Sequence, residues 1–142
     1  MEREGAPMND RLSDARLGSL PAAIATPRYD RANETPGIVH LGLGAFHRAH
    51  QAVFVDDCLS AGETGWGIVG ASLRSADTRD ALGPQDELYT LSVVDGSGER
   101  LRVIGSILTS LVAPESPTAL IDALADPGIR IVTLTVTEKA SS

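Results

Sequence analysis

The sequence has few cysteines and few basic residues. Cys58 is its single cysteine, which excludes a disulfide within the chain and agrees with a reducing compartment. Lys and Arg number 12 against 19 Asp and Glu, giving a formal net charge of −7. This balance argues against binding to the phosphate backbone of nucleic acids, which requires clustered basic side chains. Small anionic ligands are not excluded, because a few local donors suffice to hold them.

Long apolar runs are also missing. The N-terminal stretch MEREGAPMNDRLSDARLGSL has no apolar core of signal-peptide length. No run approaches the roughly 18 residues of a membrane-spanning helix. These absences favour a cytoplasmic protein with no membrane partner. The 142 residues are 42% hydrophobic and 22% charged, which is ordinary for one soluble domain with a buried core.

The chain divides into a polar lead-in and a folded domain. Residues 1–36 are polar and broken by three prolines, so they carry at most a short helix within 9–20, capped by Asp10. Residues 37–142 form the predicted domain. Periodicity and turn residues predict strands and helices in alternation. The strands are expected at 37–44, 66–73, 88–94, 99–107 and 129–136, and the helices at 46–62 and 116–128.

Local signals mark the ends of these elements. Gly62 is expected to end the first helix, and Ser116 with Pro117 to begin the second. The sequence Asp95-Gly96-Ser97-Gly98 predicts a tight turn that joins two strands into a hairpin. The polar connection at 74–87 has room for one helical turn. Continuous apolar strands separated by helices predict an α/β fold with a parallel sheet covered on both faces.

The last predicted strand, 129–136, is the most β-branched and is followed only by TEKASS. Ligands of open α/β sheets bind just beyond the carboxyl ends of the strands. The chain therefore ends where a site should be completed. We interpret it as a truncated part of a longer protein, in which the last strand leaves an exposed edge.

The stretch IVHLGLGAFHRAH, residues 38–50, carries a candidate phosphate-binding turn. Gly42 and Gly44 follow a strand and precede a helix, as in the dinucleotide fingerprint G-x-G-x-x-G. Gly42 would permit the tight turn, and Gly44 would let the backbone approach a pyrophosphate near the helix start. His47 stands in place of the third glycine. Both a phosphate cradle and a simple strand-to-helix turn fit this pattern.

All three histidines, His40, His47 and His50, lie in the same stretch. His47 and His50 are three residues apart on a predicted helix, but no cysteine or acid completes a usual zinc spacing. We therefore expect polar or packing contacts and no metal. Asp77 follows the second strand and is a candidate acceptor for the adenosine ribose, at 33 residues beyond Gly44. Its alternative role is to cap the turn that follows.

Five segments together resemble the N-terminal domain of the mannitol dehydrogenase family. That family contains long-chain polyol and hexuronate oxidoreductases, among them mannitol 2-dehydrogenase, fructuronate reductase and tagaturonate reductase. The resemblance covers about residues 10 to 139. It is carried by GIVHLGLGAFHRAHQA, WGIVGASLRSAD, DELYTL, RVIGSI and IRIVTLTVTEK.

The resemblance implies a Rossmann-type domain that binds NAD(H). The residues implied to line the pyrophosphate turn are Gly42, Gly44, Ala45 and Phe46. Asp77 would face the adenosine ribose and favour NAD over NADP, although Ala76 stands where some relatives carry a second acid. Glu138 would lie near the nicotinamide and the proton pathway. The implied reaction is hydride transfer between NAD and a polyol or sugar acid.

The chain also departs from this family. Relatives continue TEKGY or TEGGY where this sequence has TEKASS. The family's catalytic lysine, a general base that works without zinc, belongs to a helical C-terminal substrate domain that is absent here. Lys139 is not that residue, although a lysine at this position slightly favours fructuronate reductase over mannitol dehydrogenase. We expect this chain alone to be inactive; a non-catalytic nucleotide-binding module and a non-functional fragment are the alternatives.

Overall fold

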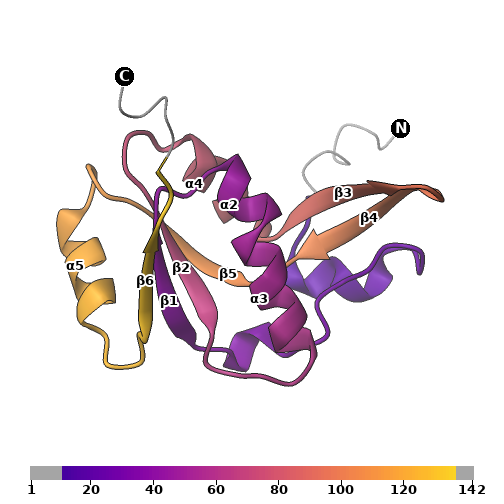
Figure 1. The fold of residues 1–142 in the computed structure, drawn as a ribbon, viewed down its shortest axis with the longest axis horizontal. Helices are drawn as coiled ribbons and strands as arrows, with labels where there is room; N and C mark the ends of the chain where they lie inside the picture. The colour runs from indigo at the N-terminus through magenta and orange to yellow at the C-terminus, as the bar shows by residue number, and fades with distance from the viewer. Residues whose placement is uncertain (1–10, 137–142) are drawn as a thin grey trace.

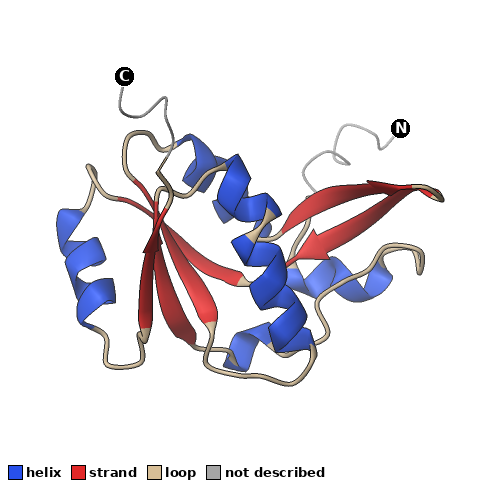
Figure 2. Ribbon diagram, viewed as in Figure 1, coloured by secondary structure: helices blue, strands red, loops and turns tan. Residues whose placement is uncertain are grey.

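A computed structural model describes residues 11–136 and contains a four-stranded parallel sheet with a separate hairpin (Figures 1 and 2). The sheet has the order β5-β2-β1-β6, and all three pairings are parallel. Its strands are β1 (Pro36–Leu41), β2 (Gly67–Ser72), β5 (Ile107–Val112) and β6 (Ile131–Leu134). The predicted α/β class with a parallel sheet is confirmed.

Strand β1 lies between two parallel partners. Ile38 is opposite Ile68 of β2 and Ile131 of β6, and it is buried. Because all four strands run in the same direction, their carboxyl ends gather at one edge of the sheet. The connections β1–α3–β2 and β5–α5–β6 proceed in opposite directions across the sheet. The change of direction lies between β1 and β6, which is where open α/β sheets bind their ligands.

Helices α2 (Ala45–Ala49) and α3 (Gln51–Ser60) pack on one side of the sheet, and α5 (Pro117–Ala125) lies on the other (Figure 1). The predicted helix 46–62 is therefore divided, because His50 leaves helical geometry with φ −125° and ψ −83°. Gly62 follows the end of α3 with φ +108°, a conformation that suits glycine. No helix within residues 11–136 is long and apolar enough to cross a membrane.

Helix α5 begins as predicted, with the Ser116 hydroxyl accepting a hydrogen bond from the Ala119 N–H and Pro117 in the first turn. Yet α5 buries none of its residues, and the apolar side chains of β6 are largely exposed. The prediction of a sheet covered on both faces is therefore wrong at β6. The physical reason is that, within the described residues, no helix packs closely enough on β6 to cover its apolar side chains.

The polar connection after β2 contains a short helix, α4 (Asp77–Leu82), and a 3₁₀ turn, η4 (Gly83–Gln85). The hairpin follows, formed by β3 (Tyr89–Asp95) and β4 (Gly98–Ile104) in antiparallel register. Its turn is where it was predicted. The Ser97 backbone N–H and hydroxyl both donate to the Asp95 carboxylate, and these hydrogen bonds are the main cause of the lowered pKa of Asp95.

The predicted single strand 99–107 is wrong, because the chain leaves the hairpin at Gly105-Ser106 and starts β5 at Ile107. Ser106 is fully buried, and its hydroxyl donates to the Ala52 carbonyl oxygen at 2.6 Å. This contact with α3 fixes the point where the backbone changes from hairpin to parallel sheet. Strand β5 was not predicted as a separate element.

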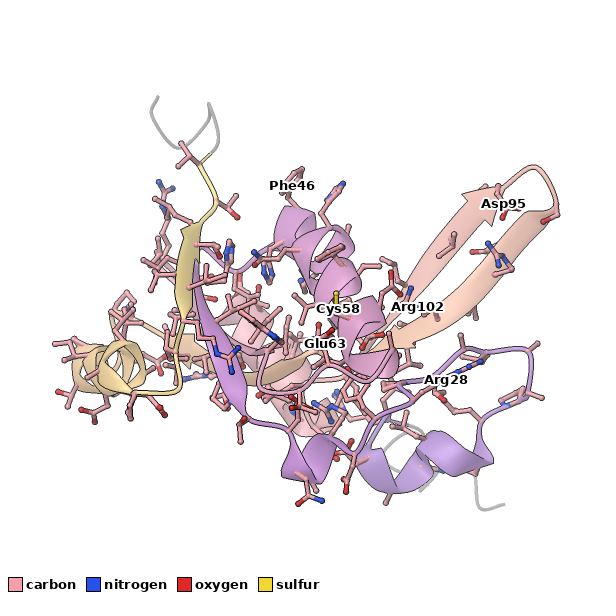
Figure 3. All side chains as sticks on the ribbon, turned by 60° about the horizontal axis from the view of Figure 1, so that its bottom comes forward. Arg28, Phe46, Cys58, Glu63, Asp95 and Arg102 are labelled. Atoms are coloured by element: carbon pink, nitrogen blue, oxygen red, sulfur yellow. The ribbon has the colours of Figure 1, made fainter. Side chains whose placement is uncertain are left out.

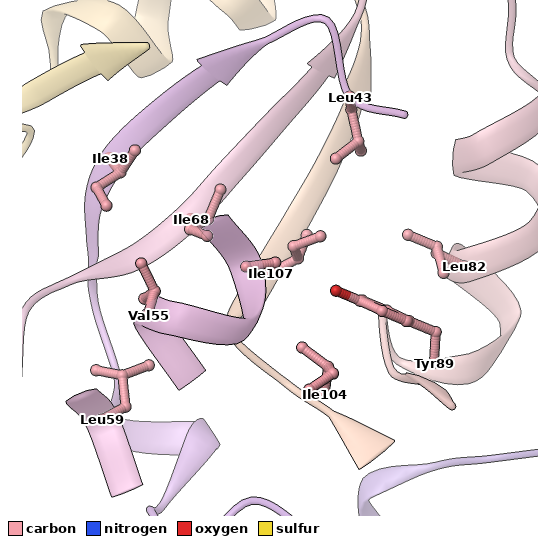
Figure 4. Close-up of a cluster of buried hydrophobic side chains, with 10 residues drawn as sticks. Ile38, Leu43, Val55, Leu59, Ile68, Leu82, Tyr89, Ile104 and Ile107 are labelled. Carbon is pink, nitrogen blue, oxygen red and sulfur yellow. The ribbon is translucent and has the colours of Figure 1, made fainter. Parts of the chain in front are cut away.

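The main hydrophobic core joins the sheet, α3 and the base of the hairpin (Figure 4). Tyr89, the first residue of β3, enters this core and donates its hydroxyl hydrogen to the Arg48 carbonyl oxygen at 2.6 Å. The buried side chains of this core that Figure 4 labels are Ile38, Leu43, Val55, Leu59, Ile68, Leu82, Tyr89, Ile104 and Ile107. The hairpin is therefore packed into the same core as the sheet.

The described part of the lead-in has only 3₁₀ turns, η2 (Asp14–Ser19) and η3 (Arg31–Asn33), where a helix over 9–20 was predicted. The proposed cap, Asp10, lies outside the described residues. Arg31 holds the lead-in in place: its guanidinium pairs with Asp14 at 2.6 Å and donates to the carbonyl oxygens of Gly105 and Ile107. The domain boundary at 36–37 stays a prediction.

Asp56 of α3 is a buried carboxylate that joins three parts of the chain. It accepts hydrogen bonds from the Tyr29 hydroxyl, the Gly105 N–H at 3.0 Å and the Arg102 guanidinium at 2.8 Å. These partners belong to the lead-in, the end of the hairpin and β4. Burial, followed by this contact with Asp56, raises the pKa of Tyr29 far above its usual value.

We predict that Asp56→Ala lowers the free energy of unfolding by about 3 to 5 kcal/mol, because it leaves Arg102 and two neutral donors without their buried acceptor. Asp57 is the matched control: it pairs with the same Arg102 at 2.6 Å, but its side chain is 60% exposed. Asp57→Ala should cost less than about 1 kcal/mol. Urea unfolding of both variants measures the difference, and equal losses would contradict the prediction.

Candidate functional site

The glycine turn after β1 is fixed by the end of β2. The N–H groups of Gly42 and Leu43 both donate to the Ala71 carbonyl oxygen, at 2.8 and 3.1 Å. Gly42 has φ +95°, which a residue with a side chain adopts only with strain. Leu43 is buried above Gly70, where an added Cβ would lie 2.8 Å from a Leu43 methyl carbon. Glycine at both positions therefore allows the turn to close over the sheet.

Gly44 precedes α2 in extended geometry and faces open space. Among the described residues other than its chain neighbours, the atom nearest to a Cβ added there would be the Gly42 carbonyl oxygen, at 3.9 Å. The first backbone hydrogen bond of α2 runs from the Arg48 N–H to the Gly44 carbonyl oxygen. The N–H groups of Ala45, Phe46 and His47 precede it and have no helical acceptor. Gly44 therefore leaves room for a ligand beside backbone donors that have no acceptor within α2.

A hollow of about 440 Å³ lies over this turn. It brings together all four residues expected at the pyrophosphate turn, and it extends to the end of β2 and to Thr135 beyond β6. Phe46 is 63% exposed and projects from the start of α2 (Figure 3). The lining residues are Gly42, Leu43, Gly44, Ala45, Phe46, Ser72, Leu73, Arg74, Ser75, Thr78 and Thr135.

Asp77 does not line this hollow, although its neighbour Thr78 does. It is the exposed first residue of α4, and its N–H donates to the Ser75 hydroxyl at 3.4 Å. Sequence reasoning did not assign Arg74 to the site, and this residue does line the hollow. The position of Arg74 just after β2 could have indicated this role, because ligands bind at the carboxyl ends of parallel strands. Glu138 and Lys139 lie outside the described residues, so the role expected for Glu138 stays a prediction.

A second hollow, of about 560 Å³, shares Phe46 and Thr135 with the first. Its wall contains two buried histidines, His40 of β1 and His47 of α2, whose rings stack with centroids 3.8 Å apart. His47, at the third-glycine position, is only 2% exposed. A stacked ring thus fills the space between helix and strand that the third glycine would otherwise keep narrow.

The third histidine, His50, is exposed and stacks on Phe46, so His47 and His50 do not share a ligand face. The contacts of all three rings fit the packing role expected from the sequence. Within residues 11–136, no group of three or more His, Cys, Asp or Glu side chains is arranged to hold a metal ion. Cys58, the single cysteine, is half-buried on α3.

A further hollow, of about 550 Å³, lies between the lead-in, α3 and the hairpin. Figure 3 shows Arg28 and Arg102 on this side of the molecule, away from Phe46. Its acids, Asp56 and Asp57, are both paired with Arg102. Because it is remote from the carboxyl ends of the parallel strands, we place the candidate site at the glycine turn.

Burial lowers the pKa of both stacked histidines, and the nearby His40 adds to the effect on His47, whose pKa falls to about 4. Below the ordinary value of 6.5 the unfolded chain therefore binds more protons than the folded chain. We predict that stability decreases as the pH falls from 6.5 to 4, with His47 contributing at most about 3 kcal/mol.

Urea unfolding at pH 7 and pH 4.5 measures this loss. His47→Phe keeps a ring in the stack but removes the titrating group, so its stability should depend less on pH. His50→Ala removes an exposed histidine and should keep the pH dependence of the unchanged chain. A His47→Phe variant with an unaltered pH dependence would refute the assignment.

Two named relatives are similar to most of this chain. A mannitol 2-dehydrogenase from Cereibacter sphaeroides is 49% identical over 119 residues, covering 82% of this chain and 25% of the relative. A polyol:NADP oxidoreductase from Gluconobacter oxydans is 42% identical, covering 86% of this chain and 26% of the relative. The chain thus spans about a quarter of the length of these relatives.

A solved structure has the same fold at high similarity. The mannitol 2-dehydrogenase of Pseudomonas fluorescens, in a ternary complex with NAD and D-mannitol, superposes with a TM-score of 0.84 at 46% identity. The match covers 90% of this chain and 27% of that protein. Residues 36–141 also match the family model described as the mannitol dehydrogenase Rossmann domain. With its glycine turn at the carboxyl edge of a parallel sheet, this chain belongs to the mannitol dehydrogenase family.

Proposed function

We propose that this chain is the NAD(H)-binding domain of an oxidoreductase that transfers a hydride between NAD and a polyol. The observation that carries the proposal is the hollow over the Gly42–Phe46 turn, at the point where the strand order of the sheet reverses. The related Pseudomonas fluorescens enzyme, solved with NAD and D-mannitol, supports the choice of cofactor and substrate class.

The residues of the turn would hold the pyrophosphate by shape and by backbone donors. Gly44 leaves the close approach open, and the free N–H groups at the start of α2 favour negative charge. On the β2 side, the Ser75 and Thr78 side chains are available to the adenosine half. NAD supplies the hydride chemistry when bound, while the protein supplies its position.

We propose as substrate a polyol and its ketose, of the mannitol and fructose type, because relatives of this chain are named mannitol 2-dehydrogenases and one was solved with D-mannitol. A sugar acid and its keto-uronate are the alternative, suggested by Lys139. Glu138, just beyond the described residues, is proposed to lie near the nicotinamide and the proton pathway. The base for the substrate hydroxyl would come from a separate helical domain.

Binding and turnover test this proposal separately. Trp66 is the only tryptophan, so quenching of its emission by NADH gives a binding signal from the unchanged chain. We expect saturable NADH binding. We expect no NADH oxidation by this chain alone with fructose or fructuronate, because hydride transfer also needs a positioned base and a substrate pocket. Absence of NADH binding would overturn the proposed function. Oxidation of NADH by this chain alone would show that the catalytic base does not come from a separate domain.

We predict that Gly44→Val abolishes NADH binding while the chain stays folded. Within residues 11–136, and apart from the neighbours of Gly44 in the chain, no atom lies closer than 3.9 Å to the added Cβ, so the valine would occupy the space left for the ligand. Gly83→Val is the control, because that glycine also faces open space but lies in η4, outside the hollow. NADH titrations and thermal unfolding of both variants measure the outcome. Normal binding by Gly44→Val would move the cradle elsewhere.

We predict that NADH binds at least about tenfold more tightly than NADPH, and that Asp77→Ala narrows this difference. A carboxylate accepts hydrogen bonds from ribose hydroxyls but repels a 2′-phosphate. Arg74 lines the hollow and should act in the opposite direction, so Arg74→Ala should weaken NADPH more than NADH. Parallel titrations with both cofactors provide the measurement. Equal affinities in the unchanged chain would remove Asp77 from this role.

A further inference from the structure

Five polar side chains form one continuous hydrogen-bonded chain beside the glycine turn. His40 Nε2 and Nδ1 lie 2.7 Å from the Thr135 hydroxyl and 2.6 Å from the Thr133 hydroxyl. Gln51 Oε1 lies 3.3 Å from the Thr133 hydroxyl and 2.7 Å from His47 Nε2. This series of hydrogen bonds therefore begins at Thr135, just after β6, and ends at His47 of α2. Thr135 lines both hollows, whereas His47 lines only the second.

Which group donates and which accepts in each of these hydrogen bonds can be worked out from His47. His47 Nδ1 is buried and has no hydrogen-bond partner among residues 11–136. If Gln51 accepts from His47 Nε2–H, the orphan atom is a lone pair; in the reverse direction it is an N–H group. Buried N–H donors without a partner are rarer than unsatisfied acceptors. The structure therefore favours the direction in which His47 donates and Gln51 Oε1 accepts.

This assignment then determines the donor and the acceptor in each remaining hydrogen bond. Gln51 Oε1 also accepts from the Thr133 hydroxyl, so Thr133 must accept from His40 Nδ1–H. His40 is neutral at pH 7, because burial lowers its pKa from 6.5. Its Nε2 consequently carries a lone pair and accepts the Thr135 hydroxyl hydrogen. Thr135 thus has its only donor hydrogen engaged by His40, and its oxygen can act only as an acceptor toward a ligand.

Thr135 stands where a ligand on the turn would pass. It lines both hollows, and a Cβ added to Gly42 would lie 3.5 Å from the Cβ of Thr135. Its N–H donates to the Leu41 carbonyl oxygen at 3.0 Å, which fixes its backbone beside β1. The β2 end of the first hollow is available to the adenosine half, so the β6 end at Thr135 would face the other half of a dinucleotide.

We propose that Thr135 is a cofactor-binding residue that accepts a hydrogen bond from a ribose hydroxyl of the nicotinamide riboside half of NAD(H). His40, Thr133, Gln51 and His47 are positioning residues that fix it as an acceptor. This proposal rests on the proposed function. It adds a requirement that the glycine turn does not impose, namely that the ligand offers a donor at the end of β6.

Three ligands and two variants test the proposal by titration of the 142-residue chain. ADP lacks the second ribose, ADP-ribose contains it, and NADH adds the carboxamide. Thr135→Val keeps the shape of the side chain but removes the hydroxyl, and should weaken NADH and ADP-ribose about threefold to tenfold while leaving ADP within twofold. Thr135→Ser restores the hydroxyl and should bind all three ligands like the unchanged chain.

The remaining outcomes are equally decisive. Weakening of NADH alone would keep Thr135 as an acceptor but overturn the ribose as its donor, in favour of the carboxamide. Equal weakening of all three ligands, ADP included, would indicate a distorted turn and overturn the proposal. Unchanged NADH binding by Thr135→Val, alongside lost binding by Gly44→Val, would overturn it while the proposed function stands. No NADH binding to the unchanged chain would overturn both.

Discussion

The pairing of β1 with parallel partners on both sides is the constraint on which the rest of the structure depends. It brings the carboxyl ends of β2, β1 and β6 to one edge, and it makes the residue after β1 turn sharply away from the sheet. Gly42 meets that demand with φ +95°, and the Ala71 carbonyl oxygen holds the turn by two hydrogen bonds. Helix α2, the open position at Gly44 and both hollows follow from this turn.

A buried histidine in place of a small residue requires compensation. His47 has lost most of its contact with water, so its charged form is disfavoured and its polar atoms need partners. The stack on His40 supplies packing, and Gln51 supplies one hydrogen bond. Thr133 of β6 and Thr135, just beyond it, complete the network around His40. A polar network therefore joins β1 to its edge partner, at the same end of the sheet as the candidate site.

Besides the shared hydrophobic core, polar contacts at one junction hold the hairpin to the sheet. Gly105 lies between β4 and β5, and its backbone bonds to both Asp56 and Arg31. A Cβ at this glycine would lie 2.8 Å from side-chain atoms of Arg31 and Pro27. The close approach of the lead-in thus depends on a glycine at this position. Together these contacts allow an antiparallel hairpin to be inserted into a parallel α/β order without separating β2 from β5.

Local chemistry in the sequence was enough to determine the α/β order, the Asp95–Gly98 turn, the Ser116 cap and the glycine turn after β1. Each of these depends on residues close together in the chain, whose conformational preferences act locally. The family motif predicted Gly44 and Phe46 at the candidate site for the same reason, and both line the hollow over the turn. Residue type and spacing are visible in a short segment.

Only the tertiary structure decided where β4 ends and β5 begins, because the continuous apolar pattern through Ile104 and Ile107 does not reveal which partner each half pairs with. It also decided that His40 and His47 stack, and that Thr135 meets the glycine turn. His40 and Thr135 are 95 residues apart, and only the β1–β6 pairing brings them together. Contacts across a sheet depend on strand order and register, which local preferences do not specify.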